Sequence, residues 1–298
     1  MVKKLGPQGM VLIGVLFVSF SSIFIKYSTA PSLIIALYRL GFTILLMLPV
    51  VLIKKKEEIR GVDKKSLWIC IASGICLALH FATWFTSIQY TSIASSSVLV
   101  NTHPVFILIG SFLIFKERIS KKVLLCIGMA LGGGIIISLA DFAKGSHVFF
   151  GDMLAIAGAF FVAGYMLIGR VIRQQLSLIT YTFLVYTSCF VTLLIFVGAW
   201  GIPLYPYPLR EWGIFLALAV FCTLLGHSIF NWALAYVKPS FVSTAILGEP
   251  VCATFWASLL FAEIPSRWQI WGSSLIVGGI YLFLRWSQEG LQAENYGG

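Results

Sequence analysis

Two similar stretches of sequence decide the fold: YTSIASSSVLVNTHPVFILIGSFLIFKERIS at residues 90–120 and YVKPSFVSTAILGEPVCATFWASLLFAEIPS at residues 236–266. They align without gaps at a spacing of 146 residues. The alignment places polar and turn-forming residues in register: Pro104 with Pro250, Glu117 with Glu263, and Gly132-Gly133 with Gly278-Gly279. Shared hydrophobicity does not explain such a register. The chain is therefore predicted to contain two repeated halves, residues 1–142 and 149–287, followed by a tail at 288–298.

The composition indicates that lipid surrounds most of the protein. Of the 298 residues, 59% are hydrophobic and 11% are charged, and the mean hydropathy is +0.95. A soluble domain of this length carries about 25% charged residues. Too few charges are present to cover a surface that faces water, so an integral membrane protein is expected.

The apolar runs predict ten transmembrane helices. Only helices and closed β-barrels satisfy their backbone hydrogen bonds in lipid, and the runs are continuously apolar rather than alternating. A spanning helix needs about 20 mostly apolar residues. The expected spans are residues 10–28, 32–53, 67–88, 92–115, 122–140, 151–169, 178–200, 212–236, 240–262 and 268–286.

The positions of the basic residues predict the orientation. Sixteen of the 21 Lys and Arg residues lie on one set of ends and loops, four lie on the other set, and Arg39 lies inside a span. Because cytoplasmic loops are enriched in Lys and Arg, both termini and the tail are placed in the cytoplasm of a plasma-membrane protein. Five helices per half is an odd number, so the two halves are expected to be inverted relative to each other, as in secondary transporters. The net charge of +10 follows these loops, so no nucleic acid partner is expected.

The sequence resembles the EamA-type ten-helix members of the drug/metabolite transporter superfamily. The resemblance rests on Arg39, the two quoted stretches, Gly151-Asp152 and the glycine-rich segments near 128–134 and 272–279. It implies a central cavity between helices one to four and six to nine, and solute transport, often export, without ATP hydrolysis. The residue before the repeated proline differs between the halves, His103 in one and Glu249 in the other, so the resemblance does not identify the substrate.

Two charged residues stand deep inside predicted spans, away from their ends, where a charge costs about 2.5–3.5 kcal/mol and calls for a reason. Glu249 precedes Pro250, and the matching Pro104 follows His103, so both spans are expected to have a helix break there. Glu249 is a candidate for binding a proton, a cation or a substrate amine, or a structural hydrogen-bonding group. Arg39 is a candidate for binding a substrate carboxylate, for neutralising Glu249, or for reaching the headgroups.

Other polar and aromatic residues are candidates for lining the interior between the halves. His80 and Trp84 are four residues apart and share a helix face, as do His227 and Asn231. Polar groups in apolar helices face the bundle interior, whether they bind solute or only a neighbouring helix. The full candidate set for substrate binding or coupling is Glu249, Arg39, His103, Asn101, His80, Trp84, His227, Asn231 and Tyr38, with Pro104 and Pro250 as helix breaks.

These features predict a secondary active transporter, an exporter of a small amphipathic metabolite such as an amino acid or an aromatic or amine compound. The partners expected are this small molecule, H⁺ or another coupling ion, and the lipid bilayer. The alternatives are a multidrug or quaternary-cation efflux carrier and an intramembrane enzyme. No hydrolase, zinc or phosphate-binding motif is present and the six cysteines lie in apolar runs, so no catalytic residue, metal or cofactor is expected. Gly128 and Gly132 form a GxxxG pattern that suits either a homodimer face or packing within the bundle.

Overall fold

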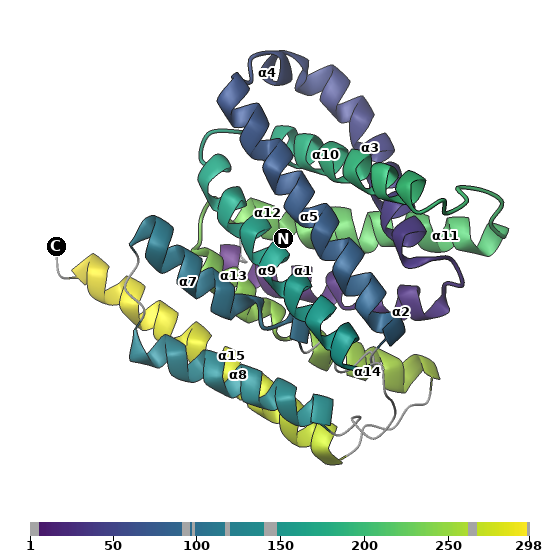
Figure 1. The fold of residues 1–298 in the computed structure, drawn as a ribbon. Coiled ribbons are helices and arrows are strands. Elements are labelled where there is room, and N and C mark those ends of the chain that lie inside the picture. The colour runs from purple at the N-terminus through teal and green to yellow at the C-terminus, as the bar shows by residue number, and fades with distance from the viewer. Residues whose placement is uncertain are drawn as a thin grey trace.

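A computed structural model describes residues 6–90, 96, 99–116, 120–139, 148–261 and 267–296. The described residues form helices joined by short connections, with no strand among them (Figure 1). The helices are α1 (Pro7–Val18), α2 (Phe20–Tyr27), α3 (Ser32–Lys54), α4 (Lys56–Arg60), α5 (Lys64–Tyr90), α7 (His103–Phe115), α8 (Lys121–Leu139), α9 (Val148–Ile172), α10 (Leu178–Ala199), α11 (Leu209–Ala217), the π-helical segment η3 (Leu218–His227), α12 (Ser228–Ala233), α13 (Pro239–Ile246), α14 (Glu249–Phe261) and α15 (Arg267–Tyr296).

Six helical stretches are long and apolar enough to cross a membrane. They are Pro7–Tyr27, Ser32–Lys54, Lys64–Tyr90, Phe150–Ile172, Leu178–Ala199 and Leu209–Ala233. The first joins α1 to α2, and the last joins α11, η3 and α12. Shorter apolar helices lie at His103–Phe115, Thr244–Ala253 and Ile270–Gly279, within three of the other predicted spans. An all-helical, multi-pass membrane fold is therefore confirmed, and the total of ten spans remains a prediction.

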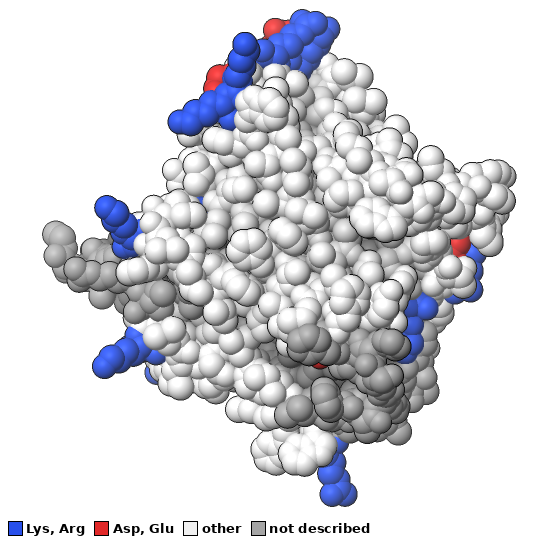
Figure 2. All heavy atoms as spheres, in the orientation of Figure 1, with Lys and Arg blue, Asp and Glu red and all other residues white. Residues whose placement is uncertain are grey.

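Charged side chains gather at the ends of the bundle, and its flank is apolar. The face in Figure 2 is largely uncharged, with a cluster of Lys and Arg at the end where α4 lies in Figure 1. Large apolar side chains are widely exposed along the helices; Leu45 is 61% exposed and Ile195 is 63% exposed. Exposure on this scale would be unfavourable in water and is expected when lipid is the solvent.

The centre of the bundle is formed by α3, α5, α9 and α10. Helix α5 packs on α9 and α10, and α10 also packs along α3. A glycine permits the close approach of α5 and α10: a Cβ atom on Gly74 would lie 2.5 Å from the Ser188 side chain and 2.6 Å from the Val185 carbonyl oxygen. Small residues of this kind let membrane helices pack closely enough for direct polar contacts. Accordingly, the Ser188 hydroxyl donates to the Ile71 carbonyl oxygen at 3.0 Å.

Helices α8 and α15 pack together along one side of this centre (Figure 1). Their close contact uses Gly133, where an added Cβ would lie 2.4 Å from the Gly272 carbonyl oxygen. The predicted GxxxG residues, Gly128 and Gly132, are not part of that contact, because a Cβ at either would meet nothing within 4 Å. The homodimer expected as one option for this pattern remains a prediction.

The C-terminal helix is longer than the apolar run of the sequence predicts. Helix α15 continues to Tyr296, whereas the expected span ends near residue 286. Hydrophobicity ends there, but the following Gln, Glu, Leu and Ala residues favour a helix in water as well. Residues 117–119 and 262–266, in the repeated turns, lie outside the described residues, as does the chain from 140 to 147.

Candidate functional site

The guanidinium group of Arg39 is fully buried in the middle of the bundle. Arg39 lies on α3 and is 0% exposed. Its Nε donates to the Thr223 hydroxyl of η3 at 2.7 Å, and its Nη1 donates to the Ser21 hydroxyl of α2 at 3.3 Å. The Phe81 ring of α5 lies under the group, with 4.9 Å from Cζ to the ring centroid. These contacts fix the arginine and rule out the predicted alternative in which it reaches the headgroups.

One nitrogen of this buried group has no partner. Arg39 Nη2 is buried and makes no hydrogen bond. The ion pairs found within 4 Å in the described part of the chain, Lys55–Glu58 and Arg60–Glu57, lie in and beside α4 at the end of the bundle. A buried charge is normally paired, because removing one partner costs several kcal/mol. The free Nη2 therefore marks a position suited to an anionic group.

Glu249 is the acid that faces Arg39 inside the bundle. It begins α14, is partly buried, and lies within electrostatic range of Arg39 without forming an ion pair with it. Direct neutralisation of Arg39 by Glu249, one of the predicted alternatives, is not the arrangement in this structure. A carboxyl group and a guanidinium group are thus held apart in the same interior region.

Both repeated prolines lie at helix starts. Helix α13 ends at Ile246 and α14 begins at Glu249, so the chain is interrupted just before Pro250. Helix α7 begins at His103 after a turn at 101–102, which places Pro104 in its first turn. Proline is tolerated there because the first amides of a helix have no partner within it. Backbone interruptions at these places expose polar groups in the interior, as binding regions in membranes require.

Aromatic rings extend from Phe81 along α5. The rings of His80 and Trp84 are stacked with centroids 5.5 Å apart, and the His227 ring meets the Phe81 ring edge to face at 6.1 Å. His80 Nδ1 is 3.0 Å from the Gly158 carbonyl oxygen of α9. His80 and His227, one from each predicted pair, therefore both lie against the Phe81 ring.

Two further ring nitrogens are buried without partners. They are Trp84 Nε1 and His103 Nε2, and both residues are almost completely buried. The other nitrogen of His103, Nδ1, lies 3.2 Å from the Val100 carbonyl oxygen in the preceding turn. Buried polar atoms are nearly always satisfied in proteins, so orphaned ones ask for a function or a bound molecule. Arg39, Trp84 and His103 each contribute one such atom.

Asn231 belongs to a hydrogen-bonded network that is already satisfied. Its Oδ1 accepts from the Tyr165 hydroxyl at 2.8 Å, and its Nδ2 donates to the Tyr186 hydroxyl at 3.2 Å. Its backbone oxygen accepts from Arg173 Nε at 3.0 Å. These contacts join α9, α10 and α12. They favour the structural interpretation that the sequence left open for Asn231.

The structure also shows the surroundings of Tyr38 and Asn101. The Tyr38 hydroxyl donates to the Leu204 carbonyl oxygen at 2.7 Å, and its ring stacks on Phe215 at 5.1 Å. Tyr38 therefore contacts the connection between α10 and α11 at one end of the bundle. Asn101 is buried in the turn that precedes α7.

Sequence reasoning missed the groups that hold Arg39. Thr223, Ser21 and Phe81 contact the guanidinium group directly. Hydroxyl and phenyl side chains are common in apolar spans, so nothing in their spacing sets them apart. The π-helical geometry of η3, a form that often marks functional sites, also has no sequence signal here.

Comparisons with known proteins identify the family of the chain. The model of the EamA-like transporter family matches residues 8–139 and 149–285. The chain is 26% identical to the pseudopaline exporter CntI of Pseudomonas aeruginosa over 73% of this chain and 75% of the relative. It is 25% identical to an uncharacterized transporter of Archaeoglobus fulgidus over 95% and 97% of the two chains.

A solved crystal structure has the same fold. It superposes with a TM-score of 0.75 at 17% identity and covers 95% of this chain and 98% of its own. At this identity the likeness shows the fold alone. Two matched segments that together span most of the chain, relatives that are transporters and a buried polar interior lead to one conclusion: the protein belongs to the EamA-like transporter family and is a membrane transporter, not an enzyme.

Proposed function

We propose that the protein is a secondary active transporter that exports a small amphipathic metabolite, such as an amino acid or an aromatic or amine compound, by alternating access. The single observation that supports this best is the unpaired Nη2 of the buried Arg39. A charge held in the membrane interior with one donor free suits a solute that brings a carboxylate. Export is the direction named for the pseudopaline exporter among its relatives.

The position of the site between the two predicted halves supports a rocking mechanism. Arg39, Ser21 and Phe81 come from the predicted first half, whereas Thr223 and Glu249 come from the second. When one half rotates against the other, contacts that cross this boundary change while the site stays near the middle of the membrane. A solute bound there would be exposed first to one side and then to the other.

The same site favours a zwitterion over the alternative of a quaternary cation. A carboxylate would bind Arg39, and an ammonium group of the same solute would face Glu249. The stacked rings of His80 and Trp84 offer an apolar surface for the remainder of the molecule. A solute that carries only positive charge would be repelled by the fixed positive charge of Arg39, because it brings no carboxylate to bind the guanidinium group.

The experiment is counterflow into proteoliposomes that contain the purified protein. A thermal-shift screen of metabolites first selects a labelled solute. Competitors then separate the classes: phenylalanine as zwitterion, phenethylamine as the amine without the carboxylate, and tetraphenylphosphonium as a permanent cation. We expect zwitterions to compete and the other two to fail. Competition by the permanent cation alone would replace this function with multidrug efflux, and chemical conversion of a solute without flux would overturn transport.

The topology and the coupling are part of the proposal. Both termini are placed in the cytoplasm, because the bundle end that carries α4 is rich in Lys and Arg (Figure 2). Glu249 is proposed to couple flux to H⁺ or another cation, since it lies at a helix start beside the Arg39 site. A reporter fused after Glu289 tests the orientation: activity of that reporter on the external face would contradict it.

A further inference from the structure

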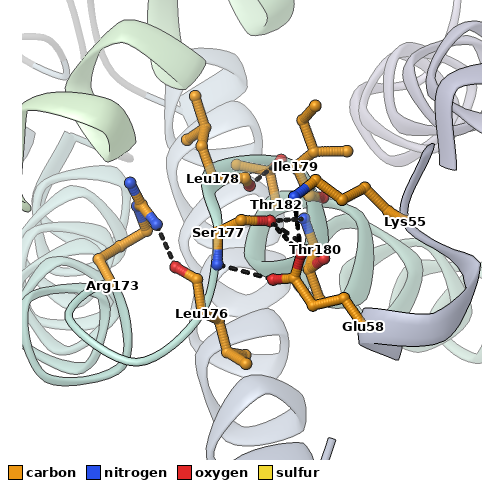
Figure 3. A network of polar contacts seen from close by, with 9 residues as sticks. All are labelled: Lys55, Glu58, Arg173, Leu176, Ser177, Leu178, Ile179, Thr180 and Thr182. Carbon is orange, nitrogen blue, oxygen red and sulfur yellow. Dashed lines mark hydrogen bonds and ion pairs between the residues drawn. The ribbon is translucent and has the colours of Figure 1, made fainter. Parts of the chain in front are cut away.

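A carboxylate joins distant loops at the end of the bundle where α4 lies (Figure 3). Glu58 on α4 accepts hydrogen bonds from the Ser177 backbone N–H and from the Ser177 hydroxyl, each at 2.8 Å. Lys55 Nζ donates to the same carboxylate at 2.8 Å. Ser177 precedes α10 and caps its first turn by accepting from the Thr180 backbone N–H. We call this contact the Glu58 clasp.

A second carboxylate makes a matching contact elsewhere. Glu211 lies in the first turn of α11, and its Oε1 accepts from the Thr29 backbone N–H at 2.9 Å and from the Thr29 hydroxyl at 3.0 Å. Its Oε2 accepts a short hydrogen bond from the Ser28 hydroxyl. Ser28 and Thr29 belong to the loop that leads into α3, whose N-terminal flanking residue is Pro31. We call this contact the Glu211 clasp.

The two clasps have the same design in the predicted halves. Pro31 and Ser177 correspond at the repeat spacing of 146 residues, and they directly precede α3 and α10. In each case a carboxylate that follows the second span of one half, Glu58 on α4 or Glu211 at the start of α11, holds the loop before the second span of the other half. Each acid binds one backbone N–H and at least one hydroxyl of that loop.

The clasps lie at opposite ends of the same helix pair. Helix α3 starts next to the Glu211 clasp and ends next to the Glu58 clasp, and α10 packs along it. A helix of this length rises about 34 Å, close to the thickness of a bilayer. The Glu58 clasp therefore connects the two predicted halves near one membrane face, and the Glu211 clasp connects them near the other.

We propose that Glu58 and Glu211 are positioning residues that close the transport path at opposite faces, and that one clasp opens whenever its face opens. This inference rests on the proposed alternating access. Both clasps are formed in this structure, so neither loop pair is separated. Rotation of one half about an axis in the membrane plane separates the halves at one face and presses them together at the other, so opening of one clasp reinforces the second.

Polar clasps suit a contact that must form and break in every cycle. When Glu58 separates from Ser177, water can replace the lost hydrogen bonds at this end of the bundle, where the Glu58 side chain is 29% exposed. Partial burial raises the pKa of Glu58, but hydrogen bonds from Lys55 and Ser177 outweigh this effect and bring it down to about 2. The acid is thus ionised at every physiological pH, and the Glu58 clasp does not act as a pH switch.

Hydrogen–deuterium exchange of the purified protein tests this without requiring a substrate. The Glu58→Gln variant removes the charge of the first clasp. We expect amide exchange around Ser177 to become about tenfold faster, as for the loss of a charge-assisted hydrogen bond, and exchange around Thr29 to become slower. The Glu211→Gln variant should give the opposite pattern. Opposite responses at the two ends are what a coupled pair of clasps requires.

The control variants distinguish coupling between the two clasps from a local loss of protection at one of them. Glu57→Gln alters a neighbouring acid whose carboxylate pairs with Arg60, and it should change neither end. Ser177→Ala removes one hydroxyl and keeps the backbone donor, so it provides a milder variant if Glu58→Gln does not fold. Faster exchange around Ser177 with unchanged exchange around Thr29 would identify Glu58 as a static tether and overturn the proposal.

A flux experiment then links the clasps to transport. In a background without the native cysteines, Glu58→Cys with Ser177→Cys is joined by a reducible bis-methanethiosulfonate reagent. We expect the joined protein to lose counterflow relative to the same double variant before joining, and to recover it on reduction. Full counterflow in the joined state would overturn the clasp. Absence of counterflow in the parent protein would instead count against the proposed function and leave the exchange result to decide the clasps.

Discussion

Arg39 and Glu249 lie within electrostatic range of each other inside the bundle, but no ion pair joins them. The guanidinium group instead relies on two hydroxyls and a phenyl ring, and one nitrogen stays unpaired. Hydroxyls satisfy hydrogen bonds without cancelling charge. The positive charge therefore remains available to a solute, which a direct ion pair with Glu249 would have prevented.

Substitution of Arg39 should weaken solute binding more than folding. In Arg39→Lys the charge stays, but one ammonium group cannot reproduce the contacts of Nε and Nη1 and also present the free donor of Nη2. We expect Arg39→Gln to reduce the apparent affinity for a carboxylate-bearing solute by about 30-fold or more, because truncating a buried charged partner costs about 2–5 kcal/mol. Arg39→Lys should be intermediate.

Counterflow with increasing solute measures this change, and Arg60→Gln, at the exposed end of α4, is the control. An Arg39→Gln protein with unchanged affinity would exclude the carboxylate contact.

Glu249 should control coupling and not solute recognition alone. We expect Glu249→Gln to abolish flux driven by a proton gradient while some solute exchange remains, because the amide cannot accept and release a proton. Flux is measured in proteoliposomes with and without an imposed pH gradient. If the variant keeps the pH dependence of the parent, Glu249 has no coupling role.

Thr223 should stabilise the fold through Arg39. Its hydroxyl accepts from Arg39 Nε at 2.7 Å, and Thr223→Val would leave that buried donor unsatisfied at nearly constant volume. We expect a loss of about 1–3 kcal/mol in the free energy of unfolding. Thermal unfolding in detergent detects the change, and Thr223→Ser, which keeps the hydroxyl, should behave like the parent. Equal stability of the valine variant would show that this donor finds another acceptor.

Gly74 and Gly128 offer a matched pair of substitutions. A Cβ on Gly74 would lie 2.5 Å from the Ser188 side chain, whereas a Cβ on Gly128 would meet nothing within 4 Å. Gly74→Ala should therefore push α5 away from α10 and destabilise the protein by about 1–3 kcal/mol. Gly128→Ala should be neutral or slightly stabilising, since alanine favours helices. The reverse order of thermal stability would contradict the close α5–α10 packing.

The Glu58 clasp predicts how stability depends on pH. Its carboxyl has a pKa of about 2 in the folded protein, against a usual value of 4.5. A lowered folded-state pKa stabilises the fold fully above the unfolded value, and this contribution is lost as the pH falls from 4.5 towards 2. The parent should thus be more stable than Glu58→Gln near neutral pH, and the difference should shrink in that acidic window. A constant difference in melting temperature across the window would rule out this linkage.

The sequence singles out the two charged candidates, which the structure places in the same interior region. Arg39 and Glu249 stand out because ionisable residues are rare in apolar runs, and the helix starts at His103 and Glu249 follow from the prolines beside them. The membrane fold follows from hydrophobicity in the same way. Arg39 and Glu249 give a clear signal because a charged group inside a membrane costs free energy unless other groups stabilise it.

The contacts between distant segments could not be predicted in this way. Glu211 lies at the end of a span, where an acid is ordinary, so nothing in the sequence connects it with Ser28 and Thr29. Tyr38 was expected near the interior site, but its hydroxyl reaches the loop at Leu204 instead. Which side chains meet depends on helix rotation and packing, and these are set by the whole bundle.

The π-helical segment η3 makes the number of residues in its span part of the site. In a π-helix each amide reaches back five residues instead of four, which fits more residues into each turn than the α-helical form does. Deleting one residue from Leu218–His227 would change the rotation of the residues on one side of the deletion relative to those on the other. Thr223 and Asn231 could then no longer both keep their present partners, on α3 and on α9 and α10. Sequence length here has a geometric role that no single side chain provides.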